Sequence, residues 1–225
     1  MNFGLVVANA VVNQGGVIAL YREGGWAMHL LLIAALIGLI FIVERVIFLY
    51  LKTGPDPIDY VNNLIETIKA KKGLDGIKAA LNSSKKDDFA IARISAAMLD
   101  KAEYGKEDME EARDTEALVS LAYLDRGMLV LAAVANIAPL IGFLGTVVGM
   151  MMAFESIAQA GTVEPTIVAD GIRVALITTA TGLMIAFPAS AFHVWFTSRI
   201  NTITRKYEEA SSMLVESVLE EEVEG

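Results

Sequence analysis

The uncharged stretch PLIGFLGTVVGM, Pro139–Met150, places three glycines and a threonine inside a long apolar run. Glycine costs about 1 kcal/mol relative to alanine within a helix in water. In a membrane, small residues three or four positions apart let helices approach closely, because packing drives their association there. Gly142, Gly145 and Gly149 have this spacing, and Thr146 lies at the edge of their face. The stretch therefore predicts a membrane helix that packs through its glycines.

Three runs are long enough to cross a hydrocarbon core, which takes about 20 apolar residues in a helix. They occupy residues 26–51, 127–154 and 173–198, and neither 127–154 nor 174–198 contains an Asp, Glu, Lys or Arg. The mean hydropathy of +0.52 is high for a soluble chain of 225 residues. We expect an all-α integral membrane protein with three transmembrane helices.

Basic residues predict how these helices cross the membrane. Twelve of the 18 Lys and Arg residues lie in the segment 52–126, and three more lie in 199–225. The positive-inside rule places both segments in the cytoplasm and leaves residues 1–25 and 155–172 outside. Residues 1–25 are expected to form an amphipathic arm on the outer membrane surface.

The segment 52–126 has apolar residues at helical spacing, which predicts a small set of amphipathic helices with a solvated charged face. Residues 106–125 contain no Gly or Pro, so we expect one unbroken helix from there into the second span. The third span is expected to continue as a helix into 199–225. The two long extensions should pack together in the cytoplasm.

Several kinds of chemistry lack the residues they need. The chain has no cysteine, and its two histidines, His29 and His193, lie far apart in the sequence, so we expect no catalytic residue and no metal site. The net charge of −9 argues against nucleic acid as a partner. The glycines of Gly142–Gly149 lack the Gly-Lys-Ser/Thr ending of a phosphate-binding loop.

The third span carries a second stripe of small residues. Its members are Ala175, Thr179, Gly182, Ala186 and Ser190. One interpretation is plain helix packing, with each threonine hydroxyl bonded to a carbonyl of its own helix. The other is a narrow polar path between subunits, to which Thr178, Thr181 and Asn136 would contribute. Because an isolated chain would expose glycine faces to lipid without benefit, the stripes also predict oligomerisation.

Two blocks now point to a family. The sequences NIAPLIGFLGTVVGMMMAF (136–154) and GIRVALITTATGLMIAFPASAFHVWF (171–196) closely resemble the ExbB/TolQ/MotA proton-channel family. The shared pattern includes Pro139 and Pro188, which we assign with Gly142, Gly145, Gly149 and Gly182 to helix packing. ERVIFL (44–49) resembles the family's Glu-Arg at the inner end of helix one, so Glu44 and Arg45 are expected at the membrane boundary. Three spans resemble the ExbB and TolQ type, whereas MotA has four.

The resemblance implies a stator subunit in the bacterial inner membrane. Such subunits form a homo-oligomeric ring, five in the ExbB and MotA types, around a single-span partner of the ExbD/TolR type. Ion flow then drives outer-membrane transport, envelope maintenance or gliding, through a TonB/TolA-like protein or a gliding machine. The ion-path residues implied here are Thr146 and Thr179, with Thr178 beside them. The ion is H⁺, with Na⁺ as an alternative, and no cofactor is implied.

One position departs from the family pattern. Many ExbB and TolQ members carry a glutamate where this chain has Val174, preceded by Arg173. With no acid inside spans two and three, the titratable carboxylate should come from an Asp in the partner's span. A competing hypothesis is a passive membrane scaffold that recruits partners and uses the small-residue stripes for packing only.

Overall fold

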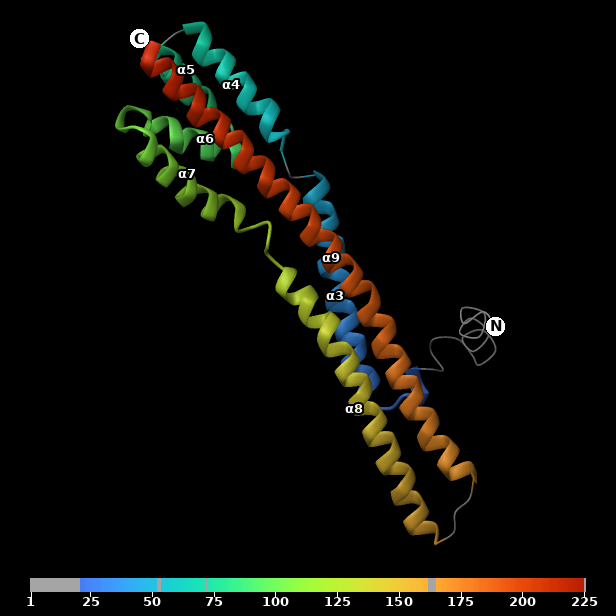
Figure 1. Ribbon diagram of the computed structural model, residues 1–225. Helices are drawn as coiled ribbons and strands as arrows, with labels where there is room; N and C mark the ends of the chain where they lie inside the picture. The colour runs from blue at the N-terminus through green and yellow to red at the C-terminus, as the bar shows by residue number, and fades with distance from the viewer. Residues whose placement is uncertain (1–20, 52–53, 72, 162–164, 225) are drawn as a thin grey trace, which may run out of the picture. The chain divides into compact units, whose positions relative to one another are not determined.

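The computed structural model describes residues 21–51, 54–71, 73–161 and 165–224, and every regular element among them is a helix (Figure 1). In chain order these are α3 (Ala27–Leu51), α4 (Pro57–Lys71), α5 (Gly73–Ser84), α6 (Ala90–Asp100), the 3₁₀ helix η1 (Ala102–Tyr104), α7 (Lys106–Leu121), α8 (Met128–Ala160) and α9 (Pro165–Glu224). The all-α fold is confirmed. The amphipathic arm expected near the N-terminus falls mostly on residues 1–20, outside the described residues.

Three described helices are long and apolar enough to cross a membrane: α3, α8 and α9. They coincide with the three runs expected from composition. Helix α8 continues to Ala160 and α9 begins at Pro165, so much of the segment 155–172 is helical. The positions at which the membrane begins and ends along these helices stay predictions.

Of the two helical extensions expected from the second and third spans, only that of the third span is continuous. Helix α9 runs unbroken for 60 residues, about 90 Å at 1.5 Å per residue, which confirms the expected extension of the third span. The unbroken helix expected from residue 106 into the second span is wrong. Helix α7 ends at Leu121, and α8 starts only at Met128, after Gly127 in the left-handed conformation with φ 83°. Arg45 of α3 donates to two backbone carbonyls within this interruption, Tyr123 O and Leu124 O.

Contacts divide the chain into two compact units. The apolar unit contains residues 1–44 and 127–194, and the charged unit contains residues 45–126 and 195–225. In the apolar unit, Met28 and Leu31 of α3 pack with Ala138 of α8 and Ala186 of α9. Helices α3 and α9 each have one part in the apolar unit and another part in the charged unit.

The charged unit is built on the apolar periodicity of its short helices. Val61, Leu64 and Ile68 of α4 are buried, and so are Ile91, Ile94, Met98 and Leu99 of α6. Gly105, with φ 103°, separates η1 from α7. Leu121 of α7 and Ile200 and Tyr207 of α9 line a common groove, and the packing of the two extensions on each other stays a prediction.

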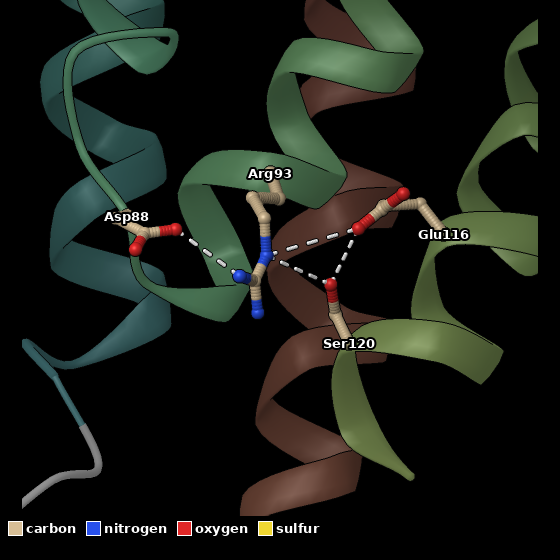
Figure 2. Close-up of polar contacts among 4 residues, drawn as sticks. All are labelled: Asp88, Arg93, Glu116 and Ser120. Carbon is tan, nitrogen blue, oxygen red and sulfur yellow. Dashed lines mark hydrogen bonds and ion pairs between the residues drawn. The ribbon is translucent and has the colours of Figure 1, made fainter. Parts of the chain in front are cut away.

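A polar cluster joins α6 to α7 (Figure 2). The Arg93 guanidinium donates to Ser120 Oγ at 3.2 Å and to Asp88 Oδ1 at 3.1 Å, and it lies 3.8 Å from Glu116 Oε1. Ser120 is buried and donates to the same Glu116 carboxylate at 2.5 Å. Most other charged side chains of this unit are exposed, as expected for a solvated face, but these four form an ordered contact.

Candidate ion-path seam between α8 and α9

The glycines of α8 face the small residues of α9 within one chain. A Cβ added to Gly142 would lie 3.0 Å from Thr178 O and 3.1 Å from Thr179 Cα. A Cβ on Gly145 would collide with the Thr178 side chain, and one on Gly182 would lie 2.6 Å from Ala138 O. The separations at Gly145 and Gly182 are shorter than real side chains show, and those at Gly142 are tight, so glycine lets the two backbones approach this closely.

The same seam continues past Gly149. A Cβ there would lie 3.0 Å from Gly171 O and 3.3 Å from the Ala175 Cβ, and Gly171 in turn packs on Ala153. The two small-residue stripes therefore cover each other inside the chain. The expectation that an isolated chain would leave its glycine faces to lipid is wrong, and the stripes alone do not require a ring.

Two threonines of α9 approach the seam differently. Thr178 is fully buried, and its hydroxyl donates to Ala175 O at 2.9 Å, with Gly142 O farther away at 3.5 Å. Thr179 is half-buried, and its hydroxyl donates across the seam to Gly142 O at 3.2 Å. Thr178 is therefore enclosed between the helices, whereas Thr179 keeps an accessible side.

Thr146 follows Gly142 by one helical turn on α8. It is half-buried, and its hydroxyl donates to Phe143 O at 2.5 Å. Thr181 and Asn136 likewise donate to carbonyls of their own helices, at 2.8 and 2.9 Å. A threonine whose hydrogen is used in this way still presents oxygen lone pairs. It can accept a hydrogen bond from a protonated acid or bind a cation.

The two prolines occupy different surroundings. Pro139 follows Ala138, whose carbonyl packs against Gly182, and it is half-buried at the edge of the seam. Pro188 is exposed on α9, so within one chain it adds nothing to the seam. Each proline lacks the N–H that would bond the carbonyl four residues earlier.

Charged groups lie away from the middle of the seam. Residues 127–154 and 174–198 contain no Asp, Glu, Lys or Arg, and His193 lies near the far end of the second range. Arg173, near the start of α9, forms an ion pair with Glu23, at 2.9 Å. No group of three or more metal-binding side chains occurs among the described residues. The middle of the seam thus brings hydroxyls, carbonyls and glycines together, whereas at the Gly149 end of the seam Asp170 lines a pocket with Gly149 and Gly171.

Near the C-terminal end of α3, Glu44 is exposed and Arg45 is buried. The Arg45 guanidinium donates to Tyr123 O and Leu124 O, both at 3.0 Å. It also lies 5.3 Å from the centre of the Phe48 ring. Sequence reasoning placed Arg45 only as a boundary charge, because its acceptors lie 78 and 79 positions away in the chain.

These features define an all-helical protein with three membrane-spanning helices and a hydroxyl-bearing helix seam. Residues 81–209 match the MotA/TolQ/ExbB proton channel family. Since the match covers more than half of the chain, the chain belongs to this family, and the resemblance inferred from its sequence blocks is confirmed. The family is one of proton channels, not of enzymes.

Individual relatives agree with this assignment. A biopolymer transport protein ExbB homolog of Methanothermobacter thermautotrophicus is 27% identical over 86% of this chain and 67% of its own length. ExbB of Salmonella typhimurium is 32% identical over 51% of this chain and 52% of its own, and TolQ of Haemophilus influenzae is 43% identical over 34% of each. The chain thus spans about half or less of the length of two of these three relatives.

A solved structure shows the same fold. The structure of C. jejuni MotAB superimposes with a TM-score of 0.62, covering 95% of this chain and 87% of the matched chain at 16% identity. The arrangement of long and short helices is therefore a known one.

Proposed function

We propose that this chain is a stator subunit of an ion-driven motor in the bacterial inner membrane, of the ExbB/TolQ type. Residues 52–126 and the C-terminus lie in the cytoplasm, and several copies form a ring, five by analogy with the family. The ring surrounds a single-span partner of the ExbD/TolR type. The ion is H⁺, with Na⁺ as the alternative.

One observation carries this proposal: Thr146 and Thr179 are half-buried residues in the acid-free segments 127–154 and 174–198, and the hydroxyl of each already donates its hydrogen to a backbone carbonyl. Such oxygens accept better than they donate. They would stabilise a neutral carboxylic acid facing them, or coordinate Na⁺, more than they would stabilise a bare carboxylate. A proton relay also needs a titratable group, so the partner's span supplies the carboxylic acid.

In this mechanism the partner's Asp takes a proton from outside and becomes neutral beside the two threonine oxygens. The Asp then releases the proton to the cytoplasmic side and becomes a charged carboxylate. The charge makes its contact with the two threonine oxygens unfavourable. The alternation between the two states drives the partner relative to the ring. The glycine seam keeps α8 and α9 together as one rigid wall during this cycle.

A passive scaffold is the second candidate. It is favoured by the finding that every seam hydroxyl described above bonds to a backbone carbonyl within the chain. On this account the threonines are packing residues, and neither ion flow nor the membrane potential affects what the protein does.

Native mass spectrometry of the purified complex tests the proposal. The chain would be expressed in a membrane host with and without the products of its neighbouring genes. We expect a homo-oligomer that captures a single-span protein with an Asp in its span. A monomer or dimer that captures no such protein would favour the scaffold.

A further inference from the structure

The interruption between α7 and α8 is not explained by its own residues. Residues 122–126, Ala-Tyr-Leu-Asp-Arg, contain no proline or glycine, and Ala, Leu and Arg are good helix formers. Gly127 is the poorest helix former in the linker, Tyr123 and Asp125 are intermediate, and a glycine costs only about 1 kcal/mol in a helix. The local sequence therefore permits a continuous helix, yet α7 ends at Leu121 and α8 begins at Met128 (Figure 1).

An interrupted helix must find new donors for its last carbonyls. In a continuous helix, Tyr123 O and Leu124 O would accept from the backbone N–H groups of residues 127 and 128. Here the Arg45 guanidinium donates to both carbonyls at 3.0 Å, and the backbone N–H of Arg126 also donates to Tyr123 O, at 3.3 Å. A cation at carbonyls of this kind also interacts favourably with the helix dipole.

Arg45 is held in place for this contact. Its side chain is 1% exposed, and Phe48, one turn later on α3, packs below the guanidinium. The Phe48 ring meets the Tyr123 ring edge to face, with centroids 5.1 Å apart and an interplanar angle of 70°. The last turns of α3 therefore contact the linker through Arg45 and through the Phe48–Tyr123 ring pair.

We propose that residues 122–127 form a joint between α7 and α8, and that Arg45 is the latch that keeps it interrupted. Without the two bonds from Arg45, the linker adopts the helical conformation that its residues permit, and α7 and α8 become one helix. The inner end of α3 thereby controls whether the second span is mechanically continuous with the cytoplasmic helix. This inference does not depend on the ion-path proposal.

A distance measurement tests the latch in the full-length protein. Because the chain has no cysteine, spin labels can be placed at Thr115→Cys on α7 and Ile137→Cys on α8, both exposed positions. Doubly labelled chains would be diluted with unlabelled chains in lipid nanodiscs and measured by pulsed electron resonance. In a continuous helix the 22 intervening steps span about 33 Å.

Arg45→Met keeps most of the side-chain volume and removes the N–H donors of the guanidinium. We expect it to shift the distance distribution to a narrow peak at about 33 Å. Arg113→Met is the matched control, because Arg113 pairs with its chain neighbour Asp114, and it should leave the distribution unchanged. Gly127→Ala, with Arg45 intact, should move part of the population to the same peak, because alanine disfavours a φ of 83°.

Three results would overturn the latch. The first is a wild-type distribution already at the continuous-helix distance. The second is an unchanged distribution in both Arg45→Met and Gly127→Ala. The third is a broad distribution without a peak in Arg45→Met while Gly127→Ala stays like the wild type, which would mean that Arg45 holds the linker against unfolding and not against helix formation.

Discussion

At the scale of single residues, neighbouring threonines differ in how far their hydroxyl groups are exposed. Thr178 and Thr179 are adjacent in sequence, yet one is enclosed by the seam and the other is half-exposed with its hydroxyl on Gly142 O. Spacing alone could mark both as candidates, because it locates residues on a face but not the covering partner. The structure supports Thr179 and Thr146 as the more accessible hydroxyls.

The glycine seam makes a prediction about stability. Gly145→Leu should weaken the packing of α8 on α9, because any side chain there collides with Thr178. Overpacking of this kind costs about 1–3 kcal/mol, so thermal unfolding in detergent should occur at a clearly lower temperature.

Val147→Leu is the control for Gly145→Leu. Val147 is 43% exposed on the same helix, so added volume there can extend away from the rest of the chain. If Gly145→Leu melts at the same temperature as Val147→Leu, the seam does not depend on its glycines.

At the scale of elements, periodicity predicted most of the helices. The third span and its extension are one helix because residues 165–224 keep an apolar face with no internal stop strong enough to end it. The interruption before α8 could not be predicted, because Arg45, which caps it, lies on another helix far away in the sequence. The Arg93 contact with Glu116 and Ser120 could not be predicted either, because these partners lie on another helix. From the sequence alone, Arg93 could not be separated from charges that are exposed to solvent.

The linker before α4 is tied to α9 by an ion pair that should respond to pH. Lys206 donates to the Asp56 carboxylate, and this bond holds the pKa of Asp56 below its usual value. Because the folded-state pKa is depressed, the pair stabilises the fold at neutral pH and this contribution is lost only as the pH falls below about 4.

Thermal melts of the wild type and of Asp56→Asn should therefore differ at pH 7, and the difference should shrink as the pH falls below about 4. Both side chains are more than one third exposed, so the difference should be small, about 0.5 kcal/mol. Equal melting temperatures at pH 7 would show that the pair adds nothing to stability.

At the scale of the whole molecule, the chain combines a membrane part and a charged helical part that share α3 and α9. Hydropathy and the family blocks were sufficient to predict this organisation, because membrane helices need a long apolar run and because the blocks cover both later spans. Neither the hydropathy nor the packing of the small-residue stripes gives the number of chains in the assembly, because the two stripes cover each other within one chain.

The orientation across the membrane can be measured with single cysteines in this cysteine-free chain. In intact spheroplasts, a membrane-impermeant maleimide should label Gln159→Cys, between the second and third spans, and should not label Glu107→Cys on α7. Both positions are exposed, so burial does not explain a difference. The opposite labelling pattern would reverse the proposed topology.

The central claim is that Thr146 and Thr179 take part in ion transfer, and proton flux into liposomes containing the purified complex with its single-span partner tests it most directly. Thr146→Val with Thr179→Val removes both oxygens while keeping the side-chain shape, and we predict that flux falls by about tenfold or more, as expected for loss of hydrogen bonds to a reacting group. Thr146→Ser with Thr179→Ser keeps the oxygens and should retain most of the flux. An intact complex whose flux is unchanged in the valine pair would contradict the ion-path account and leave the seam as helix packing.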